Sequence, residues 1–182
     1  MENIFGNVCS ERTLGDCKWI HPKKEAHTLI AYLSGGMENA ENEGADWRSE
    51  ITHWLKENLG HDVIDPVIES EKIMIANDAE NYREWKNTDP EKYKKFIRLC
   101  INQDLRSIIA KVDYLIVLWD ESILYGGGTH GEVTMAYWVD RPVFLINKLP
   151  MDKLSGWISS CSTETFESFD SMKDSLLKLY KP

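Results

Sequence analysis

Three consecutive glycines are followed closely by a threonine and a glutamate in "YGGGTHGE", residues 125–132. Thr129 and Glu132 have the spacing of a capping box, in which the glutamate side chain bonds the threonine N–H at the start of a helix. Glycines also let a backbone approach a ligand closely, and a helix N-terminus attracts phosphate or sugar groups. The stretch can therefore be a helix start or a binding loop with a catalytic carboxylate. Local sequence favours the helix start.

A second carboxylate, Asp104, lies in "CINQDLRSII" beside Leu105 and Ile108, at the edge of an apolar helix face. A helical aspartate in such a place is usually a half-exposed polar residue. It can instead point into a cleft, where burial shifts its pKa and suits it to proton transfer. The neighbouring residues do not decide between these interpretations.

Other motifs in the chain are weaker. The glycine pair in residues 34–39, "SGGMEN", lacks the Gly-x-Gly-x-x-Gly dinucleotide pattern, and the chain has no Walker loop. His130 is more often a polar surface residue than a base or ligand contact at such a position. Cys9, Cys17 and His21 lack the paired Cys-x-x-Cys spacing of structural zinc sites. We expect no metal and no cofactor.

Composition restricts the class of protein and its partners. The chain has 182 residues, 42% of them apolar and 28% charged, which is typical of one globular domain. Its net charge of −9 argues against a nucleic-acid partner. No apolar run approaches the roughly 20 residues of a membrane span, and the N-terminus has no signal pattern. We expect a cytoplasmic protein with no membrane partner.

Apolar runs predict the elements that would position these residues. The run Leu29 to Leu33 ends at a glycine pair, as in a strand buried on both faces. A clear amphipathic helix follows, with Asp46 as its expected N-cap and Gly60 as its stop. Further strands are expected within 61–66, 113–120 and 141–147 with an edge strand in 163–169, and helices over 91–111, 129–140, 152–160 and from Asp170.

Alternation of buried strands with helices predicts the fold class. It is an α/β, single-domain, doubly wound, Rossmann-like and mostly parallel sheet with helices on both faces. We expect this domain over residues 27–182, after an N-terminal arm or cap at 1–26, with a charged, partly helical insertion at about 68–90. Ligands bind beyond the carboxyl ends of the strands in such sheets, where the glycine stretch 125–132 would lie.

Four stretches in this order resemble the nucleoside 2-deoxyribosyltransferase superfamily, which also contains nucleotide N-glycosidases. They are "IAYLSGGM", "DWRSEITHWLKENLGHDVIDP", "INQDLRSIIAKVDYLIVLWD" and "GGGTHGEVTMAYWVDRPVFLI", within residues 28–147. The resemblance implies an enzyme that cleaves N-glycosidic bonds, with Glu132 as nucleophile and Asp104 as the carboxylate that handles the base. The implied substrate-binding residues are Ser34, Gly35, Gly36, Met37, Asp120, Gly127, Gly128, Thr129 and His130.

The chemistry suits two carboxylates. Bond cleavage builds positive charge on the sugar, which an anionic carboxylate stabilises and can trap covalently, while a second carboxyl group with a raised pKa protonates the base. A helix N-terminus should lower the pKa of Glu132, so we expect it to be ionised. The deoxyribosyltransferases usually carry a sugar-binding aspartate six residues before the nucleophile, where this chain has Gly126.

Several alternatives stay open from the sequence. The substrate is a nucleoside or nucleotide, and the reaction is 2-deoxyribosyl transfer or hydrolysis. Cytokinin-activating phosphoribohydrolases have a similar glycine-rich stretch, but their arginine-lysine pair is absent from "DLRSIIAK". A non-catalytic nucleotide sensor with the same fold is a third possibility. The resemblance and the aromatic "MAYWVD" segment further predict a homodimer or larger homo-oligomer.

Overall fold

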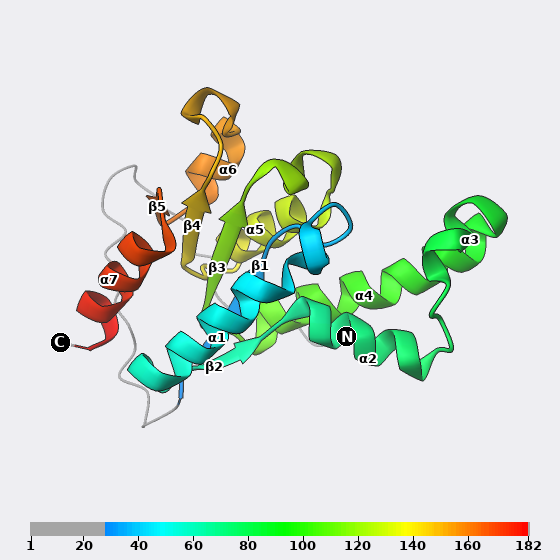
Figure 1. Ribbon diagram of the computed structural model, residues 1–182, viewed down its shortest axis with the longest axis horizontal. Coiled ribbons are helices and arrows are strands. Elements are labelled where there is room, and N and C mark those ends of the chain that lie inside the picture. Colours follow the sequence, from blue (N-terminus) through cyan, green and yellow to red (C-terminus); the bar gives the residue numbers. More distant parts are fainter. Residues whose placement is uncertain (1–27, 182) are drawn as a thin grey trace, which may run out of the picture.

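The computed structural model describes residues 28–181, and its centre is a five-stranded, all-parallel sheet (Figure 1). The strand order is β2-β1-β3-β4-β5. The strands are β1 (Ile30–Ser34), β2 (Asp62–Ile64), β3 (Tyr114–Trp119), β4 (Val143–Asn147) and β5 (Glu164–Phe166). The predicted doubly wound α/β fold and its edge strand are confirmed. The predicted arm at 1–26, with Cys9, Cys17 and His21, lies outside the described residues.

Helices cover both faces of the sheet. They are α1 (Ala45–Leu59), α2 (Pro66–Ala76), α3 (Tyr82–Thr88), α4 (Pro90–Ala110), α5 (Gly128–Trp138), α6 (Gly156–Cys161) and α7 (Phe169–Tyr180). Short 3-10 turns are η1 (Glu41–Gly44), η2 (Glu121–Tyr125) and η3 (Met151–Lys153). Within residues 28–181, none of these helices has the length and apolar character needed to cross a membrane.

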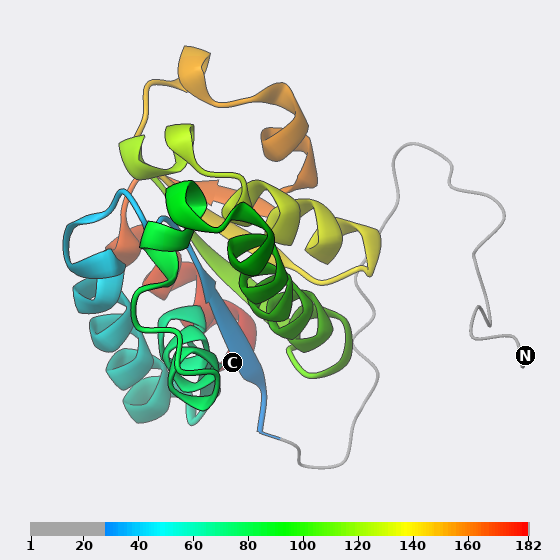
Figure 2. The ribbon, with the colours of Figure 1, turned by 90° about the vertical axis from the view of Figure 1, so that its right-hand side faces the viewer.

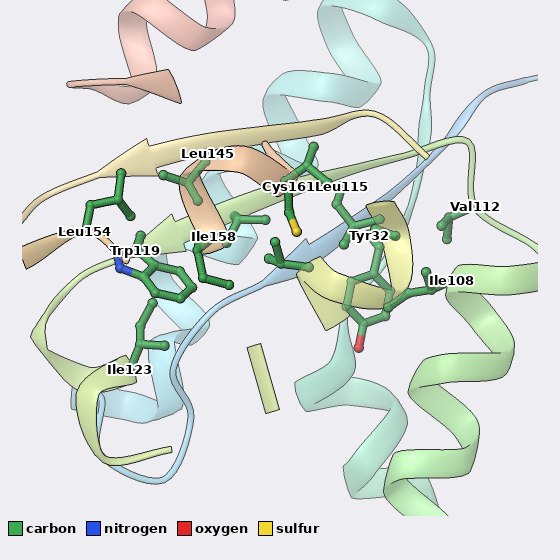
Figure 3. Close-up of a cluster of buried hydrophobic side chains, with 14 of the residues drawn as sticks. Tyr32, Ile108, Val112, Leu115, Trp119, Ile123, Leu145, Leu154, Ile158 and Cys161 are labelled. Carbon is green, nitrogen blue, oxygen red and sulfur yellow. The ribbon is translucent and has the colours of Figure 1, made fainter. Parts of the chain in front are cut away.

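Each face of the sheet has its own hydrophobic core. On one face, side chains of α4, α5 and α6 pack on alternate strand residues that include Tyr32 and Leu115 (Figure 3). On the other face, α1 and α7 pack on Leu33 and Ile116. The two sets alternate along β1 and β3 because successive strand side chains point to opposite faces. This alternation decides which helix each polar strand residue meets.

The segment predicted as a charged insertion is partly helical, as expected, because α2 and α3 lie in it. Pro66 does more than close β2: it begins α2, and the Asp65 side chain caps the helix by accepting from the Val67 N–H at 2.9 Å. Together with the first half of α4, these helices extend to one side of the sheet (Figures 1 and 2). They form a wall beyond the carboxyl end of β1.

Two predicted helix starts are wrong. Asp46 is not the N-cap of α1, because Gly44 occupies that position in the left-handed region with φ +71°, and Asp46 instead accepts from the Asn42 side chain. The final helix begins one residue before Asp170, capped by Ser168. In both cases the sequence has two possible N-cap residues two positions apart. The path of the preceding loop decides which of them caps the helix. Gly60 ends α1 as predicted.

Candidate active site

A cavity of about 500 Å³ lies beyond the carboxyl ends of β1 and β3. Five parts of the chain surround it: the loop after β1, the helices α2 and α3, the inner face of α4, the turn η2, and the glycine stretch with the start of α5. This is the edge at which a doubly wound sheet binds ligands, and the volume suits a small molecule. Both predicted catalytic residues, Glu132 and Asp104, line it.

Glu132 lies in the second turn of α5 and faces β1. Only 9% of its surface is exposed. The Tyr32 hydroxyl donates to its Oε1 at 3.0 Å, and the Ser34 hydroxyl donates a short hydrogen bond to its Oε2. Both carboxylate oxygens are therefore oriented by side chains of one strand.

The capping-box interpretation of Thr129 and Glu132 is wrong. The N-cap of α5 is Gly127, and no side chain caps this helix. Glu132 cannot reach back to the first turn because its two oxygens are engaged by Tyr32 and Ser34. The stretch whose local sequence favoured a simple helix start thus places a buried carboxylate at the wall of a cavity.

The predicted direction of the Glu132 pKa is also wrong. Burial raises the pKa of this carboxyl above its ordinary value, against the hydrogen bonds from Ser34 and Tyr32 and the charge of Arg48, which lower it. The loss of hydration outweighs any effect of the helix N-terminus, which acts mainly within the first turn. Three protein groups take the place of water in favouring the charged form.

Asp104 adopts the cleft-facing arrangement. It is half-buried on α4, and its pKa is raised to about 7, first by burial and then by the charge of Glu132, while the Tyr32 hydroxyl opposes the shift. Such a carboxyl group is partly protonated at neutral pH, as a general acid requires. The charge of Glu132 acts on the titration of Asp104, and the Tyr32 hydroxyl interacts with both carboxyl groups.

Tyr32 is a site residue that the sequence did not single out. It is fully buried, and burial together with the charges of Glu132 and Asp104 raises its pKa well above the ordinary value. The hydroxyl therefore stays protonated and can donate. Figure 3 shows the ring among apolar side chains with its oxygen pointing away from them. A signal was present: Tyr32 and Ser34 are two residues apart in an apolar strand and must share a face.

The three glycines leave room beside Glu132. Gly126, Gly127 and Gly128 all line the cavity, and a Cβ added at any of them would meet no other atom within 4 Å. Their lack of side chains keeps this rim open. Gly36 is different, because a Cβ there would lie 1.9 Å from the Ser122 hydroxyl oxygen, so close packing against η2 requires a glycine.

The predicted binding residues fall into two groups. Six of them line the cavity: Gly35, Gly36, Met37, Gly127, Gly128 and Thr129. Ser34 lies beneath the wall and contacts Glu132. Asp120 is turned to η2, where it accepts from the Ser122 N–H at 2.9 Å. His130 packs edge-on against Trp119, with ring centroids 4.8 Å apart, and does not line the cavity.

Sequence reasoning missed the far wall of the cavity, which comes from α2, α3 and α4. Its residues are Val67, Ser70, Glu71, Met74, Tyr82, Arg83, Phe96, Ile97, Cys100 and Ile101. Much of this wall is apolar or aromatic and can accept the face of a planar ring. The charged segment around 68–90 gave no signal of this role, because its cavity-facing side chains are scattered between solvated ones.

The charged side chains of the cavity wall are mostly acidic. Its carboxyl side chains are Glu38, Glu43, Glu71, Asp104 and Glu132, whereas Arg83 is the one cationic side chain in the described lining. Arg83 is itself paired with Glu43. Across residues 28–181, no group of three or more His, Cys, Asp or Glu side chains is placed to hold a metal ion.

Comparison with known proteins gives no family: no protein-family model matches the chain, and no curated protein matches it.

Proposed function

We propose that this protein cleaves the N-glycosidic bond of a nucleoside, with Glu132 as the nucleophile and Asp104 as the acid. The observation that carries the proposal is the arrangement of the two carboxyl groups. Glu132 is buried at a cavity wall with both oxygens oriented, and Asp104 has a pKa of about 7 across the shared Tyr32 hydroxyl. Paired carboxyl groups with different environments are typical of glycosidic chemistry.

The reaction would proceed in two balanced steps. A Glu132 oxygen attacks the anomeric carbon, the carbon–nitrogen bond breaks, and its electron pair leaves with the base, which takes the Asp104 proton. In the second step water attacks the anomeric carbon of the glycosyl ester. Its proton goes to the Asp104 carboxylate, and the Glu132 carboxylate is released with the free sugar. Attack by a second base in place of water would complete a transfer.

The charge of the wall favours a nucleoside without a phosphate. A phosphate carries a charge of roughly −1.5 to −2 at neutral pH. It would face the carboxylates of Glu71 and Glu132, the ion-paired carboxylates of Glu38 and Glu43, and one arginine that already has a carboxylate partner. An uncharged nucleoside avoids this repulsion. The same reasoning disfavours a phosphoribohydrolase acting on 5′-monophosphates.

Hydrolysis is the better-supported outcome of the second step. Gly126 lines the cavity where the deoxyribosyltransferases carry a sugar-binding aspartate, and a side chain there would have open space around it. A sugar held by fewer groups protects the glycosyl-enzyme less well from water. We therefore propose a nucleoside hydrolase with transfer as a side reaction.

The test is incubation with matched nucleosides and nucleoside 5′-monophosphates, in ribose and deoxyribose forms, followed by chromatography for free base. A second base is added in a parallel series to detect transfer. We expect free base from nucleosides and none from Glu132→Gln. Faster release from monophosphates would instead identify a phosphoribohydrolase, and binding without release would identify a sensor.

The homodimer expected from the sequence stays a prediction. On α5, Tyr137 and Trp138 are exposed by 46% and 74%, respectively. Large exposed aromatic side chains are typical of protein interfaces. Light scattering at micromolar concentration tests this, and a monomer would contradict it.

A further inference from the structure

Arg48 on α1 is the one buried cation among the core residues of the described chain. It has no exposed surface and does not line the cavity. Burying a guanidinium costs several kcal/mol unless its donors and its charge find partners. Its partners therefore indicate what the residue does.

The guanidinium binds the backbone on both sides of Ser34. Nε donates to the Leu33 carbonyl at 3.2 Å, and Nη2 donates to the Gly35 carbonyl at 2.9 Å. Nη1 donates to the Glu43 carbonyl at 2.8 Å. Because Leu33 and Gly35 flank Ser34, this planar fork fixes the direction in which the Ser34 hydroxyl points, and that hydroxyl donates to Glu132.

The charge of Arg48 is only partly matched by a carboxylate. The nearest one is Asp65, with Oδ1 3.6 Å from Nε, and it already caps α2. The positive charge of Arg48 also acts on Glu132, where it lowers the pKa of the carboxyl group and so opposes the effect of burial. Arg48 also interacts with Tyr32 and Asp120.

The groups acting on Glu132 come from three elements. Tyr32 and Ser34 of β1 donate hydrogen bonds to it, Arg48 of α1 supplies positive charge, and Asp104 of α4 carries the opposing carboxyl group. The charge of Arg48 lowers the pKa of Glu132, whereas the charge of Glu132 raises the pKa of Asp104. This asymmetry favours the negative charge on Glu132 and the proton on Asp104.

We propose that Arg48 is the positioning residue of the site: its guanidinium holds the backbone on both sides of Ser34, so that Ser34 stays against Glu132, and it places a buried positive charge at this end of β1. The effect of Arg48 on catalysis rests on the proposed function. The effect of Arg48 on the titration of Glu132 is independent of that function.

The test is a pH titration of the Glu132 side-chain carboxyl carbon by ¹³C NMR in the full chain, with the signal assigned by its loss in Glu132→Gln. Arg48→Met removes the charge and the fork, and Arg48→Lys keeps the charge but replaces the planar fork by a single compact ammonium group. We expect the Glu132 midpoint to rise by about one pH unit in Arg48→Met, a tenfold gain in proton affinity. In Arg48→Lys the rise should be smaller. An unchanged midpoint in folded Arg48→Met, even with a lower melting temperature, overturns the proposal.

If Arg48→Met does not fold, Asp65→Asn tests the same role, because it should shift the Glu132 midpoint in the opposite direction. Asparagine caps a helix about as well as aspartate, so α2 should be retained. The loss of its carboxylate leaves the charge of Arg48 unmatched, and the Glu132 midpoint should fall. A midpoint that stays or rises in Asp65→Asn counts against the role of Arg48.

Base release separates this inference from the proposed function. If the wild-type protein releases no base from any nucleoside, the proposed function fails, and the titration still decides the role of Arg48. If base is released but the folded Arg48→Met variant titrates as wild type, only the inference about Arg48 fails. Where both hold, the pH at which base release begins should rise in Arg48→Met by the same amount as the midpoint.

Discussion

Two fully buried tyrosines on neighbouring strands have opposite kinds of partners. Tyr32 of β1 points to the α5 face, where its hydroxyl meets the carboxyl groups of Glu132 and Asp104 at a cavity wall. Tyr114 of β3 points to the α7 face, where its hydroxyl pairs with His61 Nδ1 at 2.8 Å. The Tyr180 ring stacks on Tyr114, with centroids 5.5 Å apart.

The difference separates a structural polar cluster from the cluster that we propose to be catalytic. Burial lowers the pKa of His61 and raises that of Tyr114, so both groups stay neutral and their hydrogen bond adds about 1 kcal/mol to stability. Around Tyr32, burial raises the pKa of both Glu132 and Asp104. Holding a negative charge on these buried carboxyl groups costs stability. Carboxyl groups whose pKa is raised in this way beside a cavity are candidates for a catalytic role and not for a stabilising one.

The largest effect is expected from Glu132→Gln. Glutamine has nearly the same shape and can still bond Tyr32 and Ser34, but it carries no negative charge to attack the anomeric carbon. Base release should fall by roughly a thousandfold or more, while the melting temperature stays close to that of the wild type. Melting curves beside a chromatographic base-release assay measure both. Near-full release by this variant would sink the glycosyl-enzyme mechanism.

Asp104→Asn should have the next largest effect. The proposed acid must be protonated, and its pKa is about 7, so base release should hold below neutral pH and decline as the pH rises through that value. The variant should lose about a hundredfold in turnover and also lose this alkaline decline, while nucleoside affinity by calorimetry changes less. Equal losses in turnover and affinity, or none in either, would mean that Asp104 is structural.

A matched pair of substitutions tests the two tyrosines directly. Tyr32→Phe removes a donor from Glu132, so base release should fall by about tenfold or more, beside a loss of about 1–3 kcal/mol in the free energy of unfolding from the unsatisfied carboxylate oxygen. Tyr114→Phe leaves a buried His61 nitrogen without its partner, so the free energy of unfolding should fall by about 1–3 kcal/mol while base release persists. Denaturant unfolding and the release assay are run on both variants. If both lost stability alone, the catalytic interpretation of the Tyr32 cluster would be wrong.

The sequence predicted the elements well because local patterns decide them. Continuous apolar runs predicted the buried strands, and the resemblance directed attention to Glu132 and Asp104. Tyr32 could have been found from its two-residue spacing to Ser34, which puts both on one face of β1. The packing of helices on the sheet decides which helix covers that face, and only this packing brings Tyr32 to Glu132.

Arg48 and the α2–α3 wall could not be predicted in this way. An arginine in the second position of a "WR" pair on an amphipathic helix resembles any solvated cation, and only the return of the loop after β1 buries it. Likewise, the capping-box spacing of Thr129 and Glu132 is compatible with a cap. It is the proximity of β1 that turns the glutamate inward.

The smallest effect is expected from His61, in the pH dependence of stability. Its pKa is lowered by burial, so the unfolded chain binds a proton near pH 6.5 more readily than the folded protein does. This contribution to stability is complete above that pH and is lost as the pH falls, with a slope of at most about 1.4 kcal/mol per pH unit. Asp104 acts in the opposite direction, because its raised pKa makes the folded state bind more protons between about 4 and 7.

The two opposing contributions are separated by comparing the wild type with His61→Asn, whose amide can replace the ring Nδ1 beside Tyr114. Unfolding by urea is measured from pH 5 to pH 8, with the range set around the ordinary histidine value of about 6.5. The difference between the two proteins should be constant above neutrality and shrink as the pH falls, because only the wild type has a histidine to protonate on unfolding. A difference independent of pH would show that His61 titrates alike in both states. The cluster around Tyr114 would then be less enclosed than the one around Tyr32, and the contrast between the two tyrosines would be one of exposure and not of charge.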